Sequence, residues 1–216
     1  GSLDKLGIRY RHDTDPEQER AFRKKARELI TIETIPALEH LSFSYTGQTT
    51  SKGTLKRDEK VSNALKKLKE RKLSGVPMEQ VLVTCAKGNW YKDGNNDCAK
   101  PKPGGFAEKS RMFTSANWVA NTTRGTNDYA HCSHLIYLYD QHMNPYISRW
   151  LGLSGDKGAD DRYALTELIQ WIYRSRVRKG EPITVYLPSE RMRDLLEDWL
   201  NFTDDETMWS GALVRT

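Results

Sequence analysis

The pattern of apolar and polar positions along the chain predicts short strands that alternate with helices. Three runs rich in β-branched or aromatic residues are predicted strands, at residues 81–84, 134–139 and 183–187. Shorter runs at residues 42–45 and 117–120 predict two further strands. Continuous apolar runs of this kind are typical of a parallel sheet that is covered on both faces.

Apolar residues at helical spacing occur between these runs. They predict helices at residues 15–32, 58–72, 145–150, 161–178 and 190–200. The first helix has a clear start, because Asp15 can cap it and Pro16 suits its first position. Strands that alternate with helices predict an α/β fold, a mainly parallel sheet between helical layers.

The same pattern predicts the domain organisation. We expect residues 42–216 to form one α/β domain and residues 3–41 to form an N-terminal helical extension. Gly1 and Ser2 look like the scar that remains when an expression tag is cleaved off.

Composition adds a basic charge and excludes several classes of protein. Lys and Arg number 34 against 29 Asp and Glu, a formal net charge of +5 that favours polyanionic partners. No apolar run approaches the roughly 20 residues that cross a bilayer, so we expect no membrane association. Cys85, Cys98 and Cys132 include no Cys-x-x-Cys pair, which predicts free thiols and no metal site.

The predicted helix at residues 161–178 carries the most informative polar residues. Gln170, Arg174 and Arg178 are spaced i, i+4 and i+8, on the side opposite Leu165 and Leu168. A planar guanidinium that stays charged is well suited to bind phosphate. A solvated basic helix face would show the same pattern.

The context of these residues resembles a known family. Residues 170–180, followed by the predicted strand at 183–187, resemble motif VI of superfamily-two helicases, whose arginines contact the γ-phosphate of ATP. Residues 123–128, before the predicted strand at 134–139, are similar to motif V of that family, which contacts the nucleic-acid backbone. The chain departs from the pattern at Tyr173, where a glycine is usual, and at Asn127, where an aspartate is common.

The resemblance implies a RecA-like three-layer sandwich, the C-terminal lobe of a divergent helicase from a phage or mobile element. It implies catalytic roles for Arg174, Arg178 and Gln170, although Arg176 competes with Arg178 as the second arginine finger. It further implies a location in the cytoplasm of a bacterial or phage-infected cell. The implied nucleotide contacts are Gly125, Asn127 and Asp128, and the implied strand contacts in motif V are Thr122, Thr123 and Arg124.

Two further segments are candidates for binding a single strand. Residues 87–111 mix lysines with aromatic rings, so Lys87 and Trp90 are expected to contact phosphates and bases, although a solvated insertion would look alike. Thr46 and Gln48 carry groups that bind backbone phosphates, although turn formation explains these residues equally well.

The chain lacks the residues that hold ATP. It contains no Gly-x-x-x-x-Gly-Lys-Ser/Thr loop and no strand that ends in paired acids. We therefore expect ATP and Mg²⁺ to be bound mainly by an N-terminal RecA-like lobe, and the chain alone to be inactive as an ATPase.

One alternative of a different class stays open. A non-catalytic nucleic-acid-binding or DNA-processing module would also present a basic helix to phosphates. Residues 147–152 are similar to a segment of tyrosine recombinases, but no His-x-x-Arg accompanies them.

Overall fold

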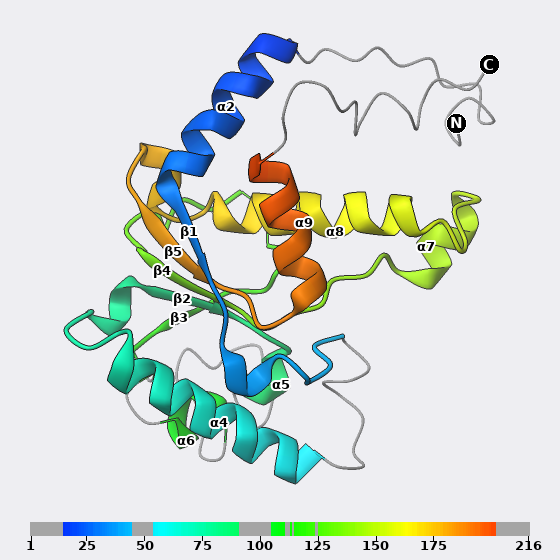
Figure 1. Cartoon of the computed structure of the whole chain (residues 1–216). Coiled ribbons are helices and arrows are strands. Elements are labelled where there is room, and N and C mark those ends of the chain that lie inside the picture. Colours follow the sequence, from blue (N-terminus) through cyan, green and yellow to red (C-terminus); the bar gives the residue numbers. More distant parts are fainter. Residues whose placement is uncertain are drawn as a thin grey trace.

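A five-stranded parallel sheet organises the computed structural model, which describes residues 15–44, 54–90, 105–110, 113, 115–123 and 125–201. The strands are β1 (Ile30–Glu33), β2 (Val81–Thr84), β3 (Asn117–Trp118), β4 (His134–Tyr137) and β5 (Ile183–Tyr186). They pair in the order β1-β5-β4-β2-β3, and every pair is parallel (Figure 1). The predicted α/β class with a mainly parallel sheet is confirmed.

Helices cover both faces of this sheet (Figure 1). One layer consists of α2 (Pro16–Leu29), α8 (Lys157–Ile172) and α9 (Glu190–Asn201), and the other of α4 (Thr54–Arg71), α5 (Lys87–Trp90) and α6 (Phe106–Lys109). The short helix α7 (Pro145–Trp150) lies beyond one end of α8, and the 3-10 turns are η1 (Pro36–Leu38), η2 (Met78–Gln80) and η3 (Arg176–Lys179). None of the described helices combines the length and apolarity that crossing a membrane requires.

The core is divided into two clusters because successive strand residues point to opposite faces. Leu82, Leu135 and Val185 pack in the cluster under α8 and α9. Val83 and Ile136, one residue further along their strands, pack in the cluster under α4. Burial of β2 on both faces explains its uninterrupted apolar sequence.

The N-terminal segment contributes to the sheet itself. Asp15 caps α2 as predicted, since its side chain accepts a hydrogen bond of 3.0 Å from the Glu17 amide. The helix ends at Leu29 rather than residue 32, because Ile30–Glu33 pairs with β5 and becomes an edge strand. Residues 30–33 are therefore part of the sheet of the α/β domain, and the expected N-terminal helical extension at residues 3–41 is wrong for this stretch.

Two other predicted elements differ most from the structure. No strand forms over the described residues 42–44, where Phe43 is buried and its carbonyl accepts from the Asp140 amide at 2.9 Å. The helix predicted at residues 161–178 spans Lys157–Ile172 instead. It starts earlier because Asp156 caps it, and it stops where Ser175 starts the η3 turn.

An arginine joins three carboxylates where α9 meets the loop after β4. Arg191 is 2.8 Å from a carboxylate oxygen of each of Asp140, Asp160 and Asp161. His142 adds a contact of 2.7 Å to Asp160. Burial alone would raise the pKa of Asp160, but hydrogen bonds from the Met143 amide and His142, with the charge of Arg191, lower it.

Removal of this cation should destabilise the fold. Arg191→Ala leaves three partly buried carboxylates without their shared partner, so we expect the free energy of unfolding to fall by about 3 kcal/mol. Chemical denaturation followed by circular dichroism measures the change. The neighbouring exposed residue supplies a control, because Glu190→Ala should change stability by no more than about 0.5 kcal/mol. Equal stability of the Arg191 variant and the wild type would contradict this role.

A half-buried histidine should make the fold sensitive to mild acid. The ring of His134 stacks on Tyr186 with centroids 6.5 Å apart. Burial, together with the positive charge of Arg176, lowers the pKa of His134 below its ordinary value of 6.5. The unfolded chain therefore binds this proton more readily than the folded chain does, so stability is full above about pH 6.5 and declines as the pH falls below it.

The substitution His134→Gln should flatten this decline between about pH 6.5 and 5. Thermal unfolding at several pH values measures the slope. The exposed His40 offers a matched control, and His40→Gln should keep the wild-type slope. A slope that His134→Gln leaves intact would assign the acid sensitivity to other groups.

Candidate functional site

A cavity of about 600 Å³ brings together the residues of the two motif-like segments. We call it the arginine cavity. The residues that line it are Phe22, Gly125, Thr126, Asn127, Gln170, Tyr173, Arg174 and Arg178.

Parallel topology explains why these segments meet. Residues 125–127 precede β4, and residues 170–178 precede β5, so both lie at the edge where the neighbouring strands begin. Backbone hydrogen bonds hold the chain together where these segments enter their strands: the Arg176 amide donates to the Cys132 carbonyl at 3.2 Å, and the Thr184 amide donates to the Ser133 carbonyl at 3.0 Å.

Arg174 brings a fixed positive charge to this cavity. Only 6% of the residue is exposed, so its position is set by packing before any ligand arrives. Its charge acts on the neighbouring Tyr129, whose pKa is nevertheless raised, mainly by burial and next by Asp128 and Cys132. A cation held in this way needs little reorganisation to interact with an anion.

Arg178 lines the same cavity, but it lies in a different structural element from the one predicted. It belongs to η3, and Arg174 lies in the turn after α8 ends at Ile172, so the two arginines do not share a continuous helix face with Gln170. Arg178 is exposed, and its Nη1 donates to Oδ1 of Asn127. Arg176 does not line the cavity, because its Nε donates to the Pro182 carbonyl at 2.6 Å. The structure therefore brings Arg178, and not Arg176, beside Arg174.

The loop before β4 supplies three of the lining residues, Gly125, Thr126 and Asn127. Gly125 adopts a left-handed conformation with φ of +70°. Asp128, a predicted nucleotide contact, is exposed but does not line the cavity, and its carboxylate accepts from Thr126 Oγ1 at 2.7 Å.

Two aromatic residues of the cavity escaped the sequence analysis as site residues. The rings of Phe22 and Tyr173 lie 4.9 Å apart, and Phe22 is 42% exposed. Burial raises the pKa of Tyr173 to about 12, so its hydroxyl stays protonated at neutral pH. The position of Tyr173 next to Arg174 was a usable signal, whereas Phe22 is far away in the sequence and resembled an ordinary apolar helix residue.

The predicted strand-binding residues that are described lie at the other edge of the sheet. Lys87 follows β2, and its Nζ lies 5.7 Å from the centroid of the Trp118 ring. Thr122 is exposed and Thr123 partly exposed in the turn after β3, where Asn121 donates to the side chain of Gln141. Thr46, Gln48 and Arg124 lie outside the described residues.

Trp90 is a predicted strand contact that the structure contradicts. The residue is fully buried, and its ring packs edge to face with Phe113 at 6.2 Å. A ring inside the core is not available to stack on a base, so the expectation is wrong for this residue. Trp90 follows a lysine and a glycine in a polar stretch, which predicted an exposed ring. The sequence alone does not show that α5 packs this ring into the core.

The two described cysteines carry no sign of metal chemistry. Burial raises the pKa of both thiols, to about 12 for Cys132, so they stay protonated and weakly reactive. Among the residues that the structure describes, no three His, Cys, Asp or Glu side chains gather as metal ligands.

The chain matches a known protein family over most of its length. The model of the YonV C-terminal Rossmann-like domain matches residues 24–200. The chain belongs to this family. The family match runs from within α2 nearly to the end of α9, so it covers the whole sheet and every residue that lines the arginine cavity except Phe22.

A curated relative supports the assignment. The chain is 34% identical over 122 residues to the SPbeta prophage-derived uncharacterized protein YonV of Bacillus subtilis (strain 168). The match covers 56% of the chain but 28% of that protein, so the chain spans well under a third of this relative. No solved structure matches the chain.

The conformation of the cavity loop yields a prediction. Gly125→Ala forces a side chain into a left-handed conformation and should lower the free energy of unfolding by about 1–2 kcal/mol, although a Cβ there would meet no atom within 4 Å. Gly88→Ala is the matched control: the new Cβ also meets nothing, but Gly88 is helical, so stability should hold or rise slightly. Denaturant titration of both variants measures the difference, and equal stabilities would rule out backbone strain as the reason for Gly125.

Proposed function

We propose that this domain is the C-terminal lobe of an ATP-dependent nucleic-acid helicase or translocase. In this proposal Arg174 and Arg178 contact the γ-phosphate of an ATP molecule that a second RecA-like lobe holds together with Mg²⁺. The observation that carries the proposal is the arginine cavity, in which both guanidinium groups and Gln170 meet residues 125–127.

The chemistry of the cavity is suited to a triphosphate end. Negative charge spreads over the oxygens of the transferred phosphoryl group, and a guanidinium stabilises it with two parallel hydrogen bonds. Arg174 is fixed by burial, whereas Arg178 is exposed and bound only through Asn127 among the described contacts. Phosphate oxygens would compete with the Asn127 amide oxygen for Arg178, which makes Asn127 a positioning residue.

The same cavity explains why a second lobe is required. None of the described residues that line it is an Asp or Glu, so none of them would ligate Mg²⁺. A metal ion would arrive with the nucleotide from the partner lobe. Arginine fingers accelerate hydrolysis only where the nucleotide, metal and water are already held in place.

Coupling between ATP and a strand would use a short segment. Residues 121–127 connect the edge that holds Thr122 with the arginine cavity, and Asn121 and Asn127 bind Gln141 and Arg178 at its two ends. Movement of Arg178 toward a phosphate would therefore pull on a segment only seven residues long. The prophage origin of the relative is consistent with a role in phage or mobile-element nucleic-acid processing in the cytoplasm of a bacterial cell.

Substitution of the exposed finger tests the proposal. In the natural protein that joins this domain to its nucleotide-holding lobe, Arg178→Ala should lower strand-stimulated kcat about a thousandfold or more, because it removes charge stabilisation in the transition state. Strand affinity should stay within about twofold. Phosphate release and fluorescence anisotropy of a labelled oligonucleotide measure the two effects.

Two cations of the same turn are the controls. Lys179 is exposed outside the cavity and Arg176 is bound to the Pro182 carbonyl, so Lys179→Ala and Arg176→Ala should both keep kcat within a few-fold. A loss of strand affinity in Arg178→Ala with unchanged hydrolysis would favour a binding module without catalysis. Robust ATP turnover by the isolated chain would also overturn the assignment to a C-terminal lobe.

A further inference from the structure

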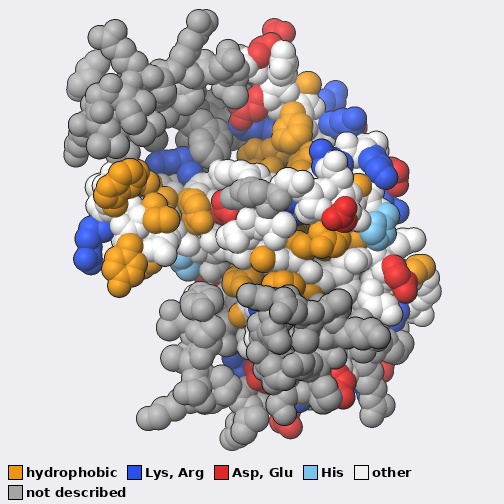
Figure 2. Space-filling model, turned by 180° about the vertical axis from the view of Figure 1, so that it is seen from behind, with side chains coloured by type: hydrophobic (Ala, Val, Ile, Leu, Met, Phe, Trp, Pro, Cys, Tyr) orange, Lys and Arg blue, Asp and Glu red, His pale blue; other side chains and the backbone are white. Residues whose placement is uncertain are grey.

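The helix α7 exposes large apolar side chains that the fold does not use. Tyr146 is 80% exposed, Ile147 52% and Trp150 75%, which makes three of the four exposed large hydrophobic residues of the described part. Figure 2 shows hydrophobic side chains with cations beside them at the end of the molecule where α7 lies. We call Tyr146, Ile147, Arg149 and Trp150 the α7 face.

Helical spacing places the two rings side by side. Tyr146 and Trp150 are four residues apart, which separates them by about 6 Å along the axis on one side of the helix. Arg149 precedes Trp150 and projects near the same side. Bases in a duplex strand stack about 3.4 Å apart. Two rings about 6 Å apart are therefore suited to a single strand, in which neighbouring bases can separate and each can stack on one ring.

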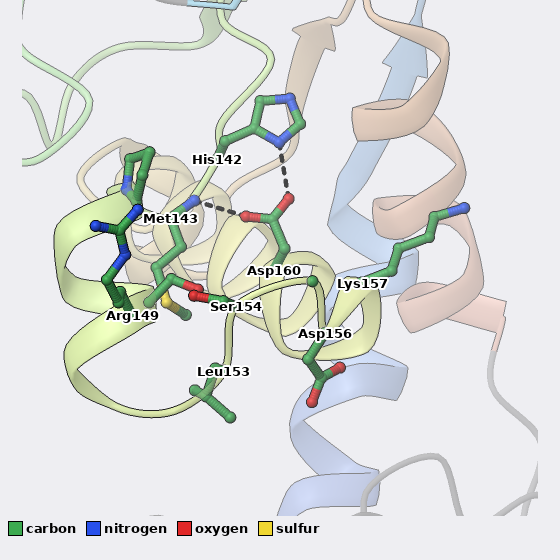
Figure 3. A pocket seen from close by; sticks show the side chains of 11 residues that line it. His142, Met143, Arg149, Leu153, Ser154, Asp156, Lys157 and Asp160 are labelled. Carbon is green, nitrogen blue, oxygen red and sulfur yellow. Dashed lines mark hydrogen bonds and ion pairs between the residues drawn. The ribbon is translucent and has the colours of Figure 1, made fainter.

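A cavity of about 490 Å³ lies next to this face (Figure 3). Arg149 and Lys157 line it on opposite sides, and neither forms an ion pair within the described part of the chain. The carboxylates of the cavity are already engaged: Asp160 accepts from His142 and the Met143 amide, and Asp156 caps α8. Arg149 and Lys157 are therefore the cations at this rim that no described carboxylate pairs with, whereas the two carboxylates beside them already accept hydrogen bonds.

The position in the fold favours a nucleic acid over a protein partner. α7 follows β4, at the sheet edge where strands end, and Gln141 of the connecting loop binds Asn121 beside Thr122. Lys87 follows β2 at this edge as well. Aromatic rings flanked by cations are typical of surfaces that bind single strands, where cations contact phosphates and rings stack on bases.

We propose that the α7 face binds single-stranded nucleic acid, with successive bases stacked on Tyr146 and Trp150 and phosphates held by Arg149 and Lys157. This inference rests on the proposed function, because it identifies the surface on which the lobe would hold its strand. It does not depend on any contact with ATP. Stacking tolerates all bases, so the surface would bind with little sequence preference.

Anisotropy of labelled oligothymidylate and oligouridylate of about 20 nucleotides, titrated with the 216-residue chain, tests this surface. Tyr146→Ala and Trp150→Ala should each weaken affinity about tenfold, since each removes one stacking platform. Tyr146→Phe and Trp150→Phe keep an aromatic ring and should stay within about threefold of the wild type. Arg149→Ala with Lys157→Ala should reduce the steepness of the salt dependence by about 1.4 in the log-log slope.

Lys67 is the matched cation control, because it is exposed on α4 in the opposite helical layer, and Lys67→Ala should leave the salt slope unchanged. Circular dichroism should show intact folding of every variant, since all four α7-face and rim side chains concerned are exposed.

Each other outcome has a distinct meaning. If the chain binds strands and the ring variants bind equally well, the inference is wrong while the proposed function stands. If the chain binds no single strand, both the inference and strand binding by this lobe are wrong. If the ring variants keep strand affinity but change the oligomeric state, the α7 face is a protein interface and the inference is overturned.

Discussion

Parallel pairing of β5 with β4 and β1 is the constraint on which the candidate site depends. Because both β4 and β5 run in the same direction, the segments that lead into them meet at one edge of the sheet. That edge receives Gly125 and Asn127 from one segment and Arg174 and Arg178 from the next. An antiparallel pairing would place these segments at opposite edges, and the arginine cavity would not exist.

The sheet thereby separates two chemistries. The edge where strands begin holds the arginine cavity, and the edge where strands end holds Lys87, Thr122 and the α7 face. In the proposed function, the phosphates of a nucleotide and of a strand would be bound at opposite ends of the same parallel strands. Residues 121–127 join the two sides, which gives the proposed coupling a physical path through one segment of backbone.

Much of the fold could be predicted from sequence because its central strands are buried on both faces. β2 matched its predicted bounds, and the capping residues of α2 and the start of α9 were visible as well. The edge strand β1 could not be recognised, since the apolar residues of helix and strand run together at Leu29 and Ile30, and only pairing with β5 decides between them. Tertiary pairing overrides local propensity at such junctions.

The candidate site was predicted for a reason that proved partly wrong. Gln170, Arg174 and Arg178 do line one cavity, but the helix that was expected to align them ends at Ile172, before either arginine. The turn η3 and the hydrogen bond from Arg178 to Asn127 achieve the same convergence. Two aromatic residues lie where the sequence did not predict them: Trp90 is buried in the core, and Phe22 lines the cavity. No local sequence pattern distinguishes an aromatic ring that points into the core from one that points outward.

The contact between Phe22 and Tyr173 has a mechanical consequence. Phe22 belongs to α2, packs against Trp199 of α9 at 5.9 Å and touches the residue that adjoins Arg174. α2 continues without a break into β1, so the helix is joined to the sheet at one end and lines the cavity through Phe22. A shift of α2 would act first on the ring of Tyr173, so the helix is placed to influence the wall of the arginine cavity beside Arg174.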